Sequence, residues 1–228
     1  TYVLVADAVE SLTDVFASTV VWGGLRVSAR DPDEQYPFGY GKAEPLAAAV
    51  VSLVILGAAA GIALHAIAEI RRPHVAPAPW TLAVLVVVVA VKWILARRVQ
   101  SVATEIGSSA VQADAWHHMS DALTSAAAFL GIAIAIWGGA GWESADDWAA
   151  LAASGVIAVN GIRMVRTASH DLMDRTAGTE IVAEVRRLAQ SVPGVLAIEK
   201  LGVRRSGMTY RVTIHVQADP KMSLDAAH

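Results

Sequence analysis

Long apolar blocks dominate the chain up to about residue 170. Five of them reach the roughly 20 mostly apolar residues that a helix needs to cross the hydrocarbon core of a membrane. The first and fourth blocks are interrupted by acidic and imidazole side chains. We therefore predict a polytopic α-helical membrane bundle with five visible spans, at residues 1–25, 44–70, 80–100, 109–138 and 147–168.

The pattern changes beyond Arg175, where the composition becomes that of an ordinary soluble domain. Apolar residues recur at helical spacing from Glu180 to Ala189, and an apolar stretch and then an alternating strand follow. This order is typical of the opening of a ferredoxin-like α/β module. We expect a transmembrane domain at 1–175 and part of such a module at 176–228, with its second helix and last strand beyond His228.

Basic residues gather in particular loops and so predict the orientation of the bundle. They flank the first and third loops and follow the fifth block, whereas the loop at 141–147 has acids and no Lys or Arg. The positive-inside rule then places those loops and the C-terminal module in the cytoplasm, with Arg71 and Arg72 the discordant pair. Five spans would leave Thr1 outside, so we expect a sixth span upstream in the full protein.

Composition supports a membrane protein and excludes several other classes. The chain is 55% hydrophobic and 17% charged, with a mean hydropathy of +0.47, which is too apolar for an ordinary soluble domain. A net charge of −3 without a dense basic patch argues against nucleic-acid binding. The chain has no cysteine, so oxygen and imidazole nitrogen must hold any bound metal.

A repeated pattern inside the first and fourth blocks supplies the candidate chemistry. ADAVESLTD at 6–14 and ADAWHHMSD at 113–121 each place two metal-capable side chains four residues apart. Positions i and i+4 share one face of a helix, so two such helices side by side would offer four ligands. Ionisable groups in a membrane helix are costly and mark an ion or proton pathway by default. The four side chains are Glu10, Asp14, His117 and Asp121.

Other polar residues of the blocks fit structural roles better. Asp7 and Asp114 lie about 60° around the helix from the ligand candidates, and His118 about 100° from His117. We interpret the two aspartates as cavity or packing groups and place His118 outside the metal's ligand shell. Gly57 and Gly61 have the spacing of close helix packing.

With these pieces in order, the chain resembles the cation diffusion facilitator family over its whole length. YPFGYGKAEPLAA at 36–48 is similar to the family's Phe-Gly-x-Gly-Lys-x-Glu loop, and Asp174-Arg175 to its Leu-x-Asp-Arg junction. EKLGVRRSG at 199–207 and the strand that holds His215 are similar to its cytoplasmic domain.

The resemblance implies a homodimeric antiporter in the bacterial inner membrane that moves divalent metal, most often zinc, out of the cytoplasm against protons. The repeated pattern would be its transport site, with Glu10 and Asp14 facing His117 and Asp121. Two further pairs carry over: Lys42 and Asp174 as a charge interlock of the dimer near the membrane boundary, and His215 and His228 as ligands of a cytoplasmic metal site. No organic cofactor is implied.

Two departures from the family's pattern bear on the metal. Glu10 stands where zinc members carry His or Asp, which puts the metal preference in doubt. Tyr36 and Tyr40 occupy the positions of histidines that bind a second metal in some members, so we predict no metal site in this loop.

The ligand set leaves several metals and functions open. One imidazole and three carboxylates suit zinc, and also iron(II), cobalt(II), manganese(II) and cadmium. An intramembrane metalloenzyme is disfavoured because no His-Glu-x-x-His pattern is present and four ligands would close the site. A membrane-anchored metal sensor or scaffold remains the alternative to transport.

Overall fold

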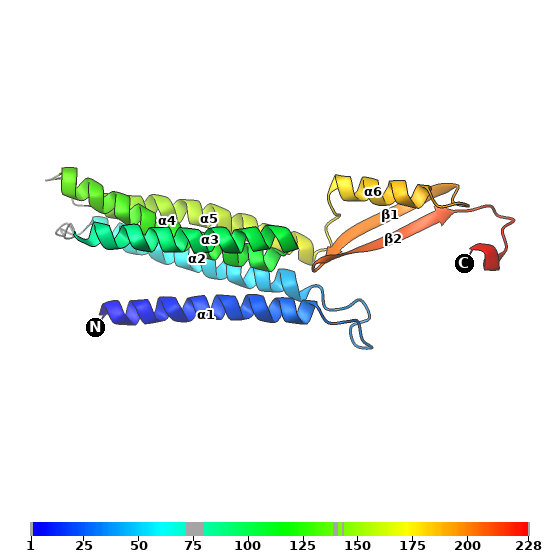
Figure 1. Cartoon of the computed structure of the whole chain (residues 1–228), viewed down its shortest axis with the longest axis horizontal. Coiled ribbons are helices and arrows are strands. Elements are labelled where there is room, and N and C mark those ends of the chain that lie inside the picture. The colour runs from blue at the N-terminus through cyan, green and yellow to red at the C-terminus, as the bar shows by residue number, and fades with distance from the viewer. Residues whose placement is uncertain (1, 72–79, 139–140, 143, 228) are drawn as a thin grey trace.

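The computed structural model describes residues 2–71, 80–138, 141–142 and 144–227, without the side chains of residues 2–14, 81, 224 and 227. Five long helices lie side by side and form one elongated bundle (Figure 1). They are α1 (Tyr2–Ser28), α2 (Ala43–Ile70), α3 (Trp80–Ile106), α4 (Ser109–Gly138) and α5 (Ala145–Leu172).

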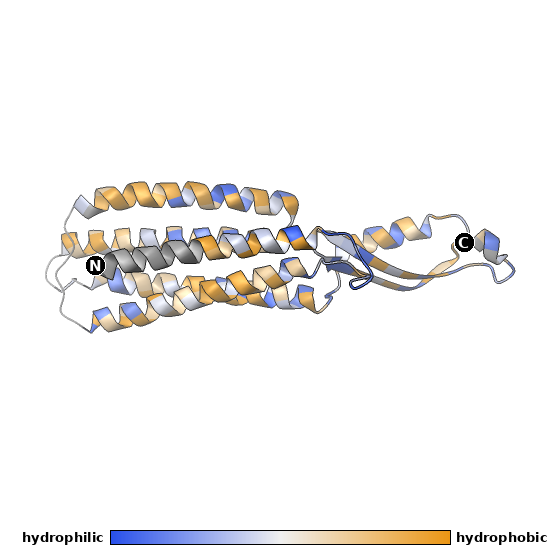
Figure 2. Cartoon of the chain, turned by 90° about the horizontal axis from the view of Figure 1, so that it is seen from below, coloured by the Kyte–Doolittle hydropathy of each residue, from blue (hydrophilic) through white to orange (hydrophobic). Residues whose placement is uncertain are grey.

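All five predicted blocks are helices, which confirms the predicted helical bundle. By length and composition, α2, α4 and α5 are able to cross a membrane, in a search of the described residues. Apolar residues predominate along the bundle, and polar residues collect in the α1–α2 loop and in the C-terminal region (Figure 2). Several helices continue past the predicted ends, because polar turns extend them beyond their apolar part.

Contacts between helices fix which elements neighbour the candidate site. The most extensive pairings are α2 with α5, α3 with α4 and α4 with α5, while α1 packs on α2 and also touches α4. The core between them is rich in small side chains, including Ala17, Ala47, Ala48 and Ala113. Small residues let helix backbones approach closely, as expected for packing in a membrane.

The predicted close packing at Gly57 and Gly61 is not seen among the described residues, where a Cβ added at either glycine would meet nothing within 4 Å. The close approaches occur elsewhere: a Cβ at Gly24 would lie 2.4 Å from the Ala47 Cβ, and one at Gly161 would lie 2.8 Å from Leu56 Cδ2. The glycines that make close contacts within the described part of the chain are thus other ones than this pair.

The C-terminal region forms the predicted helix, strand, turn and strand, so the small α/β domain is confirmed. It comprises α6 (Thr179–Gln190), β1 (Ala197–Ser206), β2 (Thr209–Gln217) and the short α7 (Leu224–Ala227). The two strands pair antiparallel around a turn at Gly207, whose φ is +63°. The apolar face of β2 stays uncovered, with Tyr210, Val212 and Val216 each close to half exposed.

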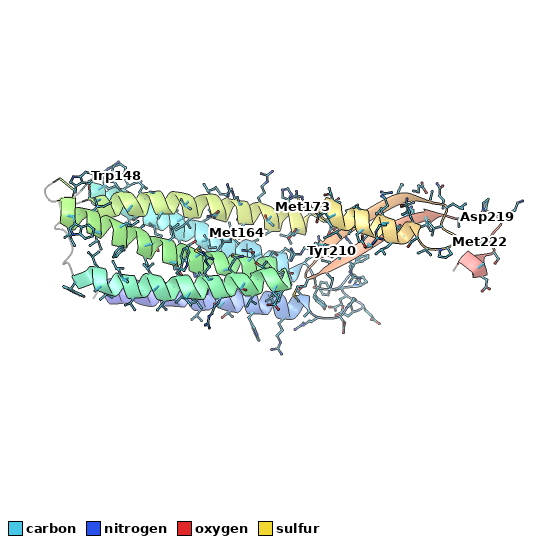
Figure 3. The ribbon with its side chains drawn as sticks, turned by 45° about the horizontal axis from the view of Figure 1, so that its top comes forward. Trp148, Met164, Met173, Tyr210, Asp219 and Met222 are labelled. Atoms are coloured by element: carbon cyan, nitrogen blue, oxygen red, sulfur yellow. The ribbon has the colours of Figure 1, made fainter. Side chains whose placement is uncertain are left out.

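The hairpin turn is in close contact with one end of the bundle. A Cβ added at Gly41, before α2, would lie 2.4 Å from Ser206 Oγ, and one added at Gly207 would lie 2.5 Å from Ser28 Oγ. Trp148 lies at the opposite end of the bundle, near the start of α5 (Figure 3). The predicted cytoplasmic module thus meets the bundle at the ends of α1, α2 and α5, far from Trp148.

Candidate metal site

His117 and Asp121 lie one turn apart in the first half of α4. The His117 side chain is buried, with the residue 5% exposed, and Asp121 is half-buried. Alanines at 113, 115 and 122 are buried around them. They favour the helix and leave room beside the two polar groups. The structure therefore places both predicted α4 ligands inside the bundle.

Glu10 and Asp14 lie on α1, but their side chains fall outside the described residues. The helices that carry the two halves of the repeated pattern do touch each other. Among the described residues no three metal-capable side chains form a cluster. Since two of the four predicted ligands lie outside that search, it does not bear on the four-ligand site, which stays a prediction.

Asp114 and His118 contact each other on a neighbouring stripe of α4. The His118 Nε2 and Asp114 Oδ2 atoms are 3.8 Å apart, one turn along the helix, and both side chains are mostly buried. Asp114 Oδ1 is buried and has no hydrogen-bond partner among the described residues. This contact gives His118 a neighbour of its own, beside the predicted ligand His117.

Lys42 and Asp174 form an ion pair where the bundle meets the C-terminal domain. Lys42 Nζ lies 2.8 Å from Asp174 Oδ1 and also donates to the carbonyl of Leu172. On its other oxygen, Asp174 accepts from Arg204 of β1 at 2.5 Å. Residues from α2, the end of α5 and the hairpin therefore meet at one carboxylate. Whether this pair acts in a dimer stays a prediction.

The backbone and the charge of Asp174 are both unusual. Its φ is +58°, in the left-handed region that Asp and Asn tolerate better than most residues. The hydrogen bond from Lys42 is the main cause that lowers the pKa of its carboxyl, and the positive charges of Lys42 and Arg204 add to the effect. The carboxylate therefore remains ionised at neutral pH and joins three elements.

Glu44 is a second linking residue, one that the sequence interpretation quoted within a motif but gave no role. It is fully buried in the first turn of α2. Its Oε1 accepts a hydrogen bond from the Ser109 backbone N–H at 2.6 Å and lies 3.4 Å from Arg205 Nη2. A carboxylate at the start of α4 interacts favourably with the positive end of that helix.

Arg205 reaches this position from the hairpin. Besides Glu44, its guanidinium donates to the carbonyls of Gly107 and Gly207. The sequence offered no clear signal, because an acid in the first turn of a helix is common. The partner could not be found from sequence either, because it lies 161 residues away.

The other predicted residues lie outside the bundle or outside the description. His215 is exposed on β2, opposite Lys200 of β1. His228 lies outside the described residues. The predicted cytoplasmic metal site therefore stays untested.

The loop before α2 is closed by tyrosine and aspartate. The rings of Tyr36 and Tyr40 lie 4.5 Å apart, and the Tyr40 hydroxyl donates to Asp33 Oδ2 at 2.6 Å. That hydrogen bond, with the backbone N–H groups of Tyr36 and Gln35, lowers the pKa of the Asp33 carboxyl. The described contacts of this loop are hydrogen bonds and ring packing, and the predicted lack of a metal there stays a prediction.

Models of known protein families match both the helical bundle and the C-terminal domain of this chain. Residues 1–173 match the family model described as cation efflux transmembrane domain, and residues 177–228 match cation efflux protein, cytoplasmic domain.

Three relatives illustrate the range of similar proteins. Magnetosome protein MamB of Paramagnetospirillum magneticum is 32% identical over 97% of this chain and 74% of its own length. Cation-efflux pump FieF of Escherichia fergusonii is 32% identical over 99% of this chain and 74% of its own. Metal tolerance protein C1 of Arabidopsis thaliana is 29% identical over 99% of this chain and 50% of its own.

Proposed function

Since this chain belongs to the cation efflux family, and is therefore an integral membrane transporter of metal cations, we propose that it exports divalent transition metals in exchange for protons. Zinc is the first candidate, and iron(II), manganese(II), cobalt(II) and cadmium are the others. We further propose that residues 1–175 form the transport domain, that residues 176–228 belong to the cytoplasmic domain, and that the protein resides in a bacterial inner membrane.

One observation supports the transport site above all. The buried His117 precedes Asp121 by one turn on α4, and α4 touches the helix that carries Glu10 and Asp14. A buried imidazole next to a carboxylate inside a membrane bundle costs free energy, and such costly groups by default mark a functional site. Together the four side chains would offer one nitrogen and three carboxylate oxygens to a metal ion.

This ligand set explains how metal and protons would compete. A carboxylate or an imidazole binds a metal only in its deprotonated form, so metal binding releases protons. Protonation from the other side of the membrane would then expel the metal. Helices that rock around a site in the middle of the bundle would expose it alternately to the two sides.

A homodimer would suit the cytoplasmic domain. The apolar residues of β2 are uncovered in the single chain, and a second copy would be able to bury such a face. In a dimer, the Lys42–Asp174 pair at the junction would lie between the bundles and the cytoplasmic domains. The His215 and His228 site would belong to the same cytoplasmic region.

Metal flux tests the proposal directly. The protein is reconstituted into vesicles with an acidic lumen, and uptake of zinc, iron(II), manganese(II) and cadmium is measured beside the Asp14→Ala and Asp121→Ala variants. We expect gradient-driven uptake that both substitutions abolish. Uptake of all metals at the rate of empty vesicles, by folded protein, would contradict transport.

The same variants separate transport from a sensor or scaffold. Under the alternative, the cytoplasmic histidines matter and the residues within the bundle are dispensable. If Asp121→Ala keeps metal tolerance in cells while His215→Ala removes it, the alternative is favoured over transport.

A further inference from the structure

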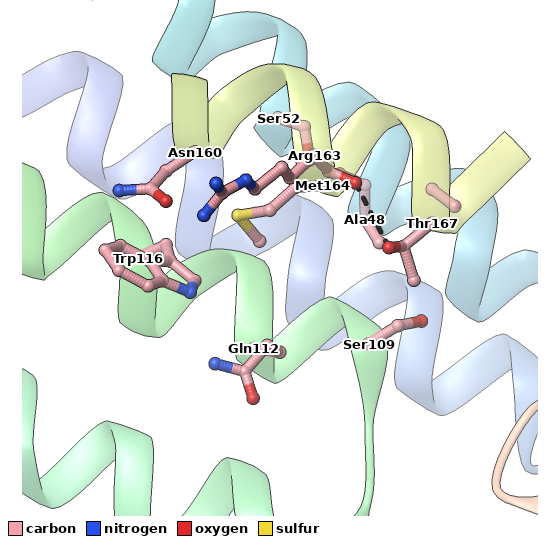
Figure 4. Close-up of a pocket in the computed structure, with 10 residues that line it drawn as sticks. Ala48, Ser52, Ser109, Gln112, Trp116, Asn160, Arg163, Met164 and Thr167 are labelled. Carbon is pink, nitrogen blue, oxygen red and sulfur yellow. Dashed lines mark hydrogen bonds between the residues drawn. The ribbon is translucent and has the colours of Figure 1, made fainter. Parts of the chain in front are cut away.

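A cavity with several polar lining residues lies between α2, α4 and α5, on the side of the bundle near the C-terminal domain (Figure 4). Its volume is about 270 Å³. None of its lining residues is acidic, and one, Arg163, is basic. It holds none of the four predicted transport ligands. The polar lining residues are Ser52, Ser109, Gln112, Asn160, Arg163 and Thr167.

Most of these polar groups already have partners. The Ser52 and Thr167 hydroxyls donate to carbonyls of their own helices, at Ala48 and Arg163. Ser109 Oγ donates to Glu44, and the Gln112 amide exchanges hydrogen bonds with Gln100 of α3. They shape the wall and have little left to offer a ligand.

Three side-chain donors are left over. The Arg163 guanidinium, the Asn160 amide and the Trp116 indole make no side-chain hydrogen bond or ion pair in the part of the chain that the structure describes. Asn160 and Arg163 are three residues apart on α5, and their side chains lie together, facing Trp116 of α4 (Figure 4). Arg163 is exposed in the single chain, and no carboxylate lines the cavity to balance its charge.

The position of Arg163 along α5, relative to the membrane, suggests where an anion that balances its charge would come from. With 28 residues, α5 is about 42 Å long, some 12 Å more than a hydrocarbon core of about 30 Å. Trp148 at the far end fits the aromatic belt of that interface, so most of the excess extends at the cytoplasmic end. Arg163 lies nine residues before Leu172, about 13 Å from this end, and its long side chain can extend from there toward the headgroups.

We propose that this cavity, the Arg163 cavity, binds the phosphate of an anionic phospholipid from the cytoplasmic leaflet. One guanidinium group can donate to two phosphate oxygens at once. The Asn160 amide and the Trp116 indole N–H would donate to the other phosphate oxygens. Exposed Val156 and Val159, on the side of α5 that carries Arg163, give acyl chains an apolar surface beside the cavity. That surface favours a lipid over free phosphate as the source of the anion.

Native mass spectrometry of the intact protein tests the proposal, because it reports bound lipid and oligomeric state together. The protein is titrated with phosphatidylglycerol and, separately, with phosphatidylcholine. Arg163→Gln removes the charge, and Asn160→Leu removes one donor at constant charge. Arg166→Gln is the matched control, an arginine of the same helix that does not line the cavity.

We expect Arg163→Gln to weaken phosphatidylglycerol binding by about five-fold or more, Asn160→Leu by about two- to three-fold, and Arg166→Gln by less than about two-fold. Phosphatidylcholine should bind more weakly than phosphatidylglycerol to the unaltered protein, and inorganic phosphate should not displace the lipid. If Arg163→Gln fails to fold, Asn160→Leu and the comparison of the two lipids still decide.

Three results would overturn the proposal. Equal losses for Arg163→Gln and Arg166→Gln would show unspecific attraction to a basic surface. Displacement by inorganic phosphate would make the cavity a site for soluble anions. Loss of oligomers in Arg163→Gln with unchanged lipid binding would assign the guanidinium to a second copy. None of these readouts requires transport, so the proposed function and this site fail separately.

Discussion

Arg205, from the C-terminal hairpin, lies 3.4 Å from the buried carboxylate of Glu44, at the start of α2 and 161 residues earlier in the chain. The same Glu44 oxygen accepts the Ser109 N–H at the start of α4, the helix that carries His117 and Asp121. The Glu44 carboxylate therefore connects the hairpin to the start of α4, the helix of the candidate metal site.

Removing Arg205 should destabilise the protein strongly. Arg205→Ala would leave the Glu44 carboxylate buried without its cation, at a cost of about 3 kcal/mol. Unfolding of the purified protein by denaturant in detergent measures the change. Arg187→Ala is the control, because Arg187 pairs with Glu184 on an exposed surface, and we expect no measurable change there. Similar behaviour of the two variants would contradict the role given to Glu44.

The close contact between Gly41 and the hairpin should not tolerate a methyl group. A Cβ at Gly41 would lie 2.7 Å from the Ser206 carbonyl carbon, which is backbone and cannot turn away. We expect Gly41→Ala to lower the thermal midpoint and to speed hydrogen exchange in the hairpin. Gly61→Ala, where nothing lies within 4 Å, should leave both unchanged. An unaltered Gly41→Ala protein would show that the hairpin does not rest there.

The Asp174 carboxylate predicts a pH dependence. Its pKa in the folded protein is lowered, chiefly by the hydrogen bond from Lys42. The stability it contributes is therefore complete above the unfolded pKa, about 3.9, and is lost as pH falls through the folded pKa. Asp174→Asn keeps a residue that tolerates positive φ while removing the charge.

Thermal melts of the two proteins from acid to neutral pH test this dependence. The difference between wild type and Asp174→Asn should be constant above about pH 5 and shrink below about pH 4. A difference that grows on acidification would have the wrong sign for an ionised Asp174.

Much of the fold was predictable from sequence, because apolar runs report directly on burial in a membrane. The block at 109–138 coincides with α4, whereas the block at 80–100 stops six residues short of the end of α3. The reason is physical: apolar composition marks the part of a helix inside the hydrocarbon, and polar turns such as Gln100 and Thr104 continue it into water.

Contacts between distant residues were not predictable in this way. The i, i+4 pattern placed His117 and Asp121 correctly on one helix, but nothing local indicated that Glu44 would meet Arg205. Spacing alone also did not identify a partner for Gly57 and Gly61 among the described residues, since a glycine pair shows that close packing is possible and not where a partner lies. Glu10 and Asp14 remain predictions.

Glu10 should influence the choice of metal. Imidazole ligands suit zinc, whereas carboxylates suit manganese(II), so Glu10→His should raise the ratio of zinc to manganese(II) flux, by roughly ten-fold. Competition between the two metals in vesicles measures this ratio. Arg187→Ala, on the exposed surface of α6, serves as the control outside the bundle and should leave the ratio unchanged. An unaltered ratio for Glu10→His would remove Glu10 from the transport site.

The most direct test of proton-coupled export records zinc entry and lumenal pH in the same vesicles, with the cytoplasmic side of the protein facing outward. We predict that zinc entry is accompanied by proton exit, that Asp121→Asn abolishes both, and that His118→Gln, next to the predicted ligand His117, retains both. Zinc entry without proton exit, or equal losses in the two variants, would contradict the account.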